Sequence, residues 1–146
     1  MKRWEWALLA GVAVLLRGAH VWLAAQSGDY EITSLDGAFY RDAALALADG
    51  TGRADAPYLL SPLYPLLLVP FVHGGVLAEH AVWVAQALLG VGTVLCTAAL
   101  AQRSSGRAAA WLAGGLAATF GPLVHFESHV ALAGPQTFFL MAALLA

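Results

Sequence analysis

The sequence is poor in charge. Only 11% of its 146 residues are Asp, Glu, Lys or Arg, whereas soluble domains contain about 25%. Apolar residues make up 60%, more apolar surface than a soluble domain of this length can cover. The net charge of −2 gives no reason to expect a nucleic-acid partner. The single cysteine, Cys96, excludes an intrachain disulfide and lies in an apolar run without metal-ligand spacing. An integral membrane protein is therefore expected.

Long apolar runs divide the chain. The first, about 4–25, just crosses a hydrocarbon core of roughly 30 Å. It is longer than the apolar part of a signal peptide and contains Arg17, so an uncleaved anchor is predicted, although residues 24–26 offer a weak cleavage site. Two further spans are predicted at about 77–101 and 108–124. We thus predict an all-α, polytopic transmembrane protein, with residues 1–146 forming one transmembrane domain.

A fourth apolar run begins at residue 136 and continues to the last residue. Its 11 residues make about half a crossing, and neither a cap nor a basic stop follows them. The sequence is therefore expected to be the N-terminal part of a longer protein, with about three complete spans and the start of a fourth.

Two polar loops and one basic turn separate the spans. The first loop, 26–76, contains an apolar block at 62–72 that is too short to span, carries three prolines and is predicted to lie at the interface. Residues 102–107 are predicted to form a tight hairpin turn between the second and third spans. The second loop is predicted at 125–135.

The charges predict an orientation. The basic residues that flank the spans all fall on one side, which the positive-inside rule makes cytoplasmic: Lys2, Arg3, Arg103 and Arg107. Every acidic residue except Glu5, and all five histidines, then fall on the other side. The tryptophans lie near both predicted interfaces, as their amphipathic rings prefer. We predict a protein of the plasma (inner) membrane with a cytoplasmic N-terminus and an outer, periplasmic acidic loop.

A short helix is predicted in the acidic loop. Ser34 or Asp36 can cap a helix with its body at 38–49 and its stop at Gly50. Helical spacing places Tyr40 one turn from Asp36 on the same stripe. Asp36 is thus held near the outer membrane surface, where it is either only a helix cap or a chemically active carboxylate. Asp42 falls on a more exposed face and is predicted to be solvated.

The ordered motifs of the chain resemble a known family. An Asp-x-x-x-Tyr helix start, a Gly-x-Gly, an interfacial Ser-Pro-Leu-Tyr-Pro and a short basic turn are similar to the first part of GT-C glycosyltransferases. The resemblance is to the family-39-like branch, which includes protein O-mannosyltransferases and the aminoarabinose transferases of lipid A. It implies that Asp36 is a general base or a metal-associated carboxylate. Gly37 stands where many members have a second acidic residue.

The resemblance also implies a reaction and its partners. A sugar would pass from a polyprenyl-phosphate donor in the bilayer to a hydroxyl of a protein or glycolipid acceptor at the outer face, with a base taking the hydroxyl proton and a cation settling the phosphate. Glu127 and His129, with His125 nearby, are candidate ligands of a divalent cation (Mg or Mn), or alternatively polar interfacial anchors. Candidate substrate-binding residues are Tyr40, Arg41, Arg53, Arg17 and Tyr64.

Other readings remain open for these residues and for the chain. Arg41 and Arg53 can equally be interfacial or solvated charges, and Arg17 can snorkel outward or pack inside the bundle. The alternative function is a non-catalytic or truncated membrane protein whose acidic loop is merely solvated. A transporter is disfavoured, because the second and third predicted spans contain no ionisable residue near their centres.

Overall fold

The computed structural model describes residues 1–27, 35–51 and 61–146 of the chain. This part of the protein is all-α apart from one small hairpin of strands, which confirms the predicted fold class at that level. Two helices, α1 (Arg3–Gln26) and α4 (Glu79–Thr119), are long and apolar enough to cross a membrane. Ser34 and Arg53, to which the sequence assigned possible roles, lie outside the described residues.

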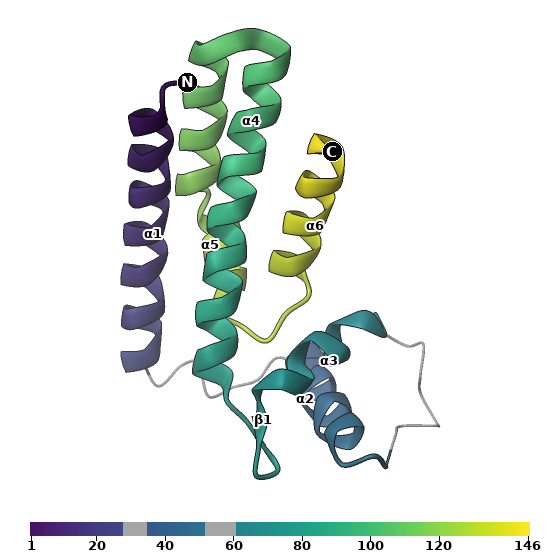
Figure 1. Cartoon of the computed structure of the whole chain (residues 1–146). Helices are drawn as coiled ribbons and strands as arrows, with labels where there is room; N and C mark the ends of the chain where they lie inside the picture. Colours follow the sequence, from purple (N-terminus) through teal and green to yellow (C-terminus); the bar gives the residue numbers. More distant parts are fainter. Residues whose placement is uncertain (28–34, 52–60) are drawn as a thin grey trace.

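Helix α1 forms where the first span was predicted, to within one residue at each end. Its start is stabilised by Glu5, whose carboxylate accepts a hydrogen bond of 2.6 Å from the backbone N–H of Lys2. Along its length α1 packs against α4 (Figure 1). Small side chains at this contact let the helices approach closely. The buried residues of the contact are Leu9, Ala13, Val94, Ala98, Ala110 and Ala118.

Helix α4 is folded back on itself at Gly106. This residue has φ 82°, a left-handed backbone that glycine adopts at little cost. The arms 79–105 and 107–119 therefore lie side by side (Figure 1), and a Cβ added at Gly114 would lie 3.0 Å from the Cβ of Ala98. The hairpin predicted at 102–107 is confirmed, although residues 102–105 remain helical.

The third predicted span, 108–124, is divided between two helices at Phe120, next to the Gly121-Pro122 pair at which the sequence indicates its end. Helix α4 ends at Thr119, Phe120 is extended, and a separate helix α5 (Gly121–Glu127) follows. Pro122 has no N–H to donate to the carbonyl of Ala118, four residues earlier, so the helical hydrogen bonding stops there. Helix α6 (Ala133–Leu145) begins three residues before the predicted 136 and packs against α4.

The acidic loop forms its own small layer below the long helices (Figure 1). It consists of α2 (Leu35–Ala48), α3 (Leu63–Leu68), a 3-10 turn η2 (Val69–Phe71) and the paired strands β1 (Val72–His73) and β2 (Val76–Leu77). Helix α2 ends before Gly50, which has φ 68°, as predicted. Asp36 lies inside the first turn of α2, so its predicted role as the cap was wrong. Within the block 62–72, α3 is six residues long, too short to span a membrane, and the interfacial position of the block stays a prediction.

The two ends of the helical bundle differ in charge. The N-terminus lies beside the turn of α4 (Figure 1), where the Met1 amino group donates to Oε1 of Gln102 at 2.6 Å. Arg107, just after the turn, pairs with Glu5 of α1. The acidic α2 lies at the opposite end of the bundle (Figure 1). The N-terminus and the basic turn thus share one end, as the charge pattern predicted.

Candidate functional site

An open cavity of about 530 Å³ lies between the acidic layer and the α5–α6 connection. We call it the Asp36 cavity. Asp36 is exposed at its rim, one helical turn from Tyr40, and two imidazoles reach it from the α5 region. The cavity therefore brings together Asp36, Tyr40 and His129, three residues that the sequence had singled out for chemistry. Its lining residues are Asp36, Tyr40, His125, Phe126, His129, Ala131, Leu132 and Ala133.

Tyr64 supports this cavity from beneath. Its ring meets the ring of Tyr40 edge-on, with centroids 4.7 Å apart and planes at 87°. Burial raises the pKa of Tyr64 far above its usual value, so the hydroxyl stays protonated and donates to Oε1 of Gln86 at 2.7 Å. Tyr64, predicted to bind substrate, is 1% exposed and does not line the cavity.

A buried ion pair joins α1 to α5. The Nε of Arg17 lies 2.7 Å from Oε2 of Glu127, and its Nη2 donates to Oε1 at 3.2 Å. Both side chains are 1% exposed; Oε1 accepts the hydrogen bond, whereas Oε2 meets Nε as an ion-pair contact without hydrogen-bond geometry. Arg17 was predicted to bind substrate, to snorkel outward or to pack inside the bundle. In the structure it packs inside the bundle. Glu127 was predicted to lie in an outer loop; it instead ends α5 with its carboxylate inside the bundle.

Two local features bring this pair together. Because Pro122 leaves the carbonyl of Ala118 without its helical donor, Nη1 of Arg17 approaches that oxygen, at 3.5 Å. Gly90 of α4 provides the space for the carboxylate, since a Cβ there would overlap the Glu127 side chain. The break in the third predicted span and the glycine in the second thus both contribute to the ion pair.

We expect Gly90→Ala to destabilise the protein. A glycine inside an exposed helix normally gains about 1 kcal/mol from this change. Here the added methyl group would displace a carboxylate that is held by Arg17, so the sign should reverse. Gly115→Ala is the matched control, because nothing lies within 4 Å of its Cβ position. Thermal unfolding in detergent, followed by circular dichroism, checks the pair. A Gly90→Ala protein that is more stable than wild type would contradict this geometry.

Histidines gather where α1 meets α5. Nε2 of His20 lies 2.9 Å from the hydroxyl of Ser128, which itself donates to the carbonyl of His125 at 2.9 Å. The ring centroids of His125 and His129 are 4.5 Å apart. Within the described residues, however, no group of three histidine, cysteine or acidic side chains could hold a metal ion. The described residues therefore offer no set of ligands for the divalent cation predicted at Glu127 and His129, and that site stays a prediction.

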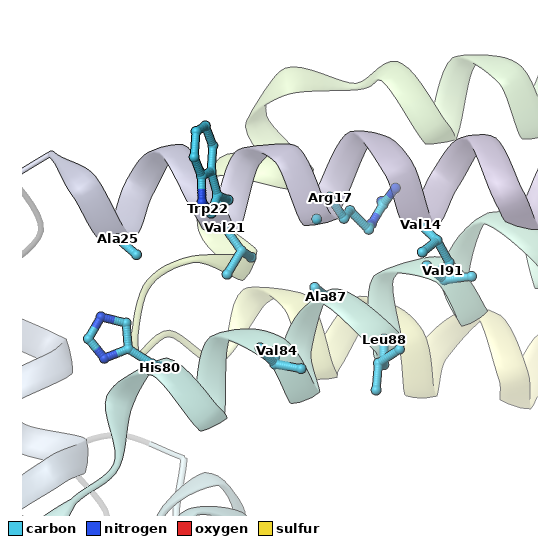
Figure 2. A pocket seen from close by; sticks show the side chains of 11 residues that line it. Val14, Arg17, Val21, Trp22, Ala25, His80, Val84, Ala87, Leu88 and Val91 are labelled. Atoms are coloured by element: carbon cyan, nitrogen blue, oxygen red, sulfur yellow. The ribbon is translucent and has the colours of Figure 1, made fainter.

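A second cavity, of about 450 Å³, runs between α1 and the first arm of α4. Figure 2 shows the apolar side chains of the two helices along it, with Ala25 and His80 toward one end and Val14 and Val91 toward the other. Arg17 also lines it, although its charged group is bound by Glu127. This groove is therefore apolar over nearly all of its length.

Two further residues lie outside the cavity lining: Arg41, which the sequence predicted, and Gln86, which it did not. Arg41 does not line the Asp36 cavity; its Nε lies 3.3 Å from Asp42 and its Nη1 4.0 Å from Glu79. Sequence reasoning missed Gln86, which bonds Tyr64 and two carbonyls of the α5 region. The signal was available, because a lone amide in an apolar run is costly unless it is bonded.

No protein-family description, no curated protein and no solved structure matches this chain.

Proposed function

We propose that the protein is a membrane glycosyltransferase of the GT-C type, which moves a sugar from a polyprenyl-phosphate donor to an acceptor hydroxyl. Asp36 is its general base. The observation that carries the proposal is the Asp36 cavity, where an exposed carboxylate, a phenol and two imidazoles meet at one end of an apolar helical bundle. A base must lie within reach of the proton that it removes, and an open rim gives an acceptor access to Asp36.

The surface of the long helices supports a membrane setting. In the most apolar stretch of each helix, only 22% of the residues of α1 and 28% of those of α4 are buried. A core helix of a soluble protein is mostly buried. Large apolar side chains such as Leu15, Leu112 and Leu116 are exposed between the charged ends of the bundle. Such a surface needs a lipid or protein partner. A lipid-linked donor would therefore have its chain beside these helices and its phosphate near the acidic layer.

The groups around Asp36 also suit the departing phosphate. Arg17 is bound to Glu127, and Arg41 lies outside the cavity lining. His125 and His129 are the basic side chains that line the cavity beside Asp36. An imidazole can donate a hydrogen bond to a phosphate oxygen, and a protonated one also neutralises its charge. These two histidines thus take the place of Arg17 and Arg41 in the proposed reaction.

The proposed orientation predicts a labelling pattern. In a Cys96→Ala background, an impermeant maleimide should label Thr51→Cys in intact cells, and should label Ser104→Cys only after the membrane is opened. Both positions are exposed, one just after α2 and one near the turn of α4, so access to the thiol depends on the side of the membrane. The opposite pattern would place the Asp36 cavity in the cytoplasm, where the outer-face reaction cannot occur.

Sugar transfer tests the function directly. Membranes that contain the full-length gene product should transfer a labelled sugar from a polyprenyl-phosphate donor to an acceptor, and a comparison of wild type with Asp36→Asn isolates the carboxylate. A protein that inserts and folds but transfers nothing from any such donor would favour the non-catalytic alternative, a membrane protein with a solvated acidic loop.

A further inference from the structure

Gln86 connects three segments that are distant in the sequence. Its side chain is 2% exposed and lies on the first arm of α4. Its Oε1 accepts the hydroxyl hydrogen of Tyr64 at 2.7 Å. Its Nε2 donates to the carbonyl of Glu127 at 2.9 Å and to the carbonyl of His129 at 2.6 Å. One buried amide thus touches α3, the end of α5 and the connection to α6.

The chemistry of this position suits an amide in particular. The Nε2 of Gln86 carries two N–H groups, one for each of the two carbonyls. Its Oε1, beside them, accepts the hydrogen of the protonated Tyr64 hydroxyl. The orientation of the amide follows from these partners. A glutamate has the same shape but no N–H, so its carboxylate would face both carbonyls without a donor. A methionine would fill the space but would remove all three of these hydrogen bonds, and the carbonyl of His129 would keep only the backbone N–H of Ala131, at 2.8 Å.

The three partners are the supports of the two walls of the Asp36 cavity. On one side, Tyr64 packs against Tyr40, which shares its helical stripe with Asp36. On the other side, the bonded carbonyl belongs to His129, whose side chain lines the cavity. Gln86 itself does not line the cavity. It is therefore placed to set the distance between the carboxylate wall and the imidazole wall.

We propose that Gln86 is a positioning residue. It fixes the distance between the two sides of the cavity, the one that carries Asp36 and the one that carries His129. Its effect on turnover rests on the proposed function, whereas its effect on the geometry of the cavity does not. A residue that only stabilises the bundle would change the melting temperature and leave the cavity of the folded protein as it is. A positioning residue changes the cavity while the protein is still folded, and lowers kcat more than it raises KM.

The test replaces Gln86 by Glu in the full-length protein labelled with 3-fluorotyrosine, and reads both the fluorine spectrum and transfer kinetics. Tyr40→Phe and Tyr64→Phe identify the two resonances. We expect the Tyr40 resonance to shift or broaden through the ring contact of Tyr40 with Tyr64, and kcat to fall roughly 10–100-fold with KM within about threefold. Thr93→Val is the matched control, because Thr93 is 3% exposed on the same helix and bonds only its own helix, at Leu89.

The outcomes separate the two proposals. A Tyr40 resonance in folded Gln86→Glu identical to that of wild type would overturn the positioning role, whatever the activity. A shifted resonance in a protein whose wild type transfers no sugar supports the positioning role and counts against the transferase. If Gln86→Glu does not fold, Gln86→Asn decides, since it keeps the amide but is one methylene shorter and cannot reach Tyr64 and both carbonyls at once. In that variant Tyr40 should still shift, and an unchanged spectrum would contradict the proposal.

Discussion

Asp36→Asn should lower the rate of sugar transfer by about 10²–10⁴, the usual effect of removing a general base. The amide keeps the size of the side chain and its ability to accept hydrogen bonds, but it takes no proton from a hydroxyl. Asp36 is exposed in the first turn of α2, so the loss of its charge costs only the interaction with the helix dipole, about 0.3–1 kcal/mol. Folding and insertion should therefore be nearly unchanged while turnover is lost.

The control for this change lies on the same helix. Asp42 is exposed on α2 and forms a surface ion pair with Arg41, whose Nε lies 3.3 Å from its Oδ1. Such pairs contribute about 0–1 kcal/mol, so Asp42→Asn should leave transfer close to wild type. Steady-state rates with a polyprenyl-phosphate sugar donor measure both variants. Equal rates for wild type and Asp36→Asn would show that the carboxylate has only a structural role.

Breaking the Arg17–Glu127 pair should have the largest effect on stability. Removing one member of a buried pair leaves the other charge without compensation, which costs about 3–5 kcal/mol. We therefore expect Glu127→Gln and Arg17→Met each to lower the unfolding temperature strongly and to reduce the amount of inserted protein. Because the uncompensated charge is the cause, the double variant should recover much of the loss.

Thermal unfolding of purified protein in detergent measures this double-mutant cycle. Arg41→Met is the control, since Arg41 is in an exposed pair and should change stability little. Single variants as stable as wild type would mean that Arg17 and Glu127 are not paired in the folded protein. A double variant less stable than both single variants would contradict charge compensation as the cause.

The ion pair also bears on the transporter alternative. That alternative was disfavoured because no ionisable residue was predicted near the centre of the second or third span. The structure brings Arg17 and Glu127 against Gly90, well inside the first arm of α4. A buried ionisable pair between long apolar helices is a functional-site hypothesis in its own right. Here the pair is closed, because both carboxylate oxygens lie against the guanidinium of Arg17 and both side chains are buried, which suits a structural connection.

Several features could be predicted because their signals are local. The bounds of α1 follow from one long, mostly apolar run between polar ends. The reversal near 102–107 follows from a short polar turn with a glycine, and Gly106 carries the left-handed backbone. The end of α2 before Gly50 follows from the same preference. In each case the residues that determine the structure lie within a few positions of it.

Other features could not be predicted, because their determinants meet only in the folded chain. Arg17 and Glu127 are 110 positions apart, and neither the break at Pro122 nor the space at Gly90 indicates a partner by itself. Gln86 and His129 are 43 positions apart. The sequence offered Glu127 and His129 either as candidate metal ligands or as polar interfacial anchors, and their local spacing could not decide between the two. Only the packing of α5 against α1 directs that carboxylate to Arg17.

The sequence by itself determined an apolar helical chain with a basic end, an acidic loop and a hairpin, since hydropathy, charge and turn residues act over short distances. It also singled out Asp36, Tyr40 and His129. Only the tertiary structure decided that these three share one cavity, that Arg17 is paired inside the bundle, that Tyr64 packs under Tyr40, and that Gln86 joins the two sides of the cavity. The physical reason is that a buried polar group must find its hydrogen-bond partner wherever the fold brings one, and that partner is seldom a neighbour in sequence.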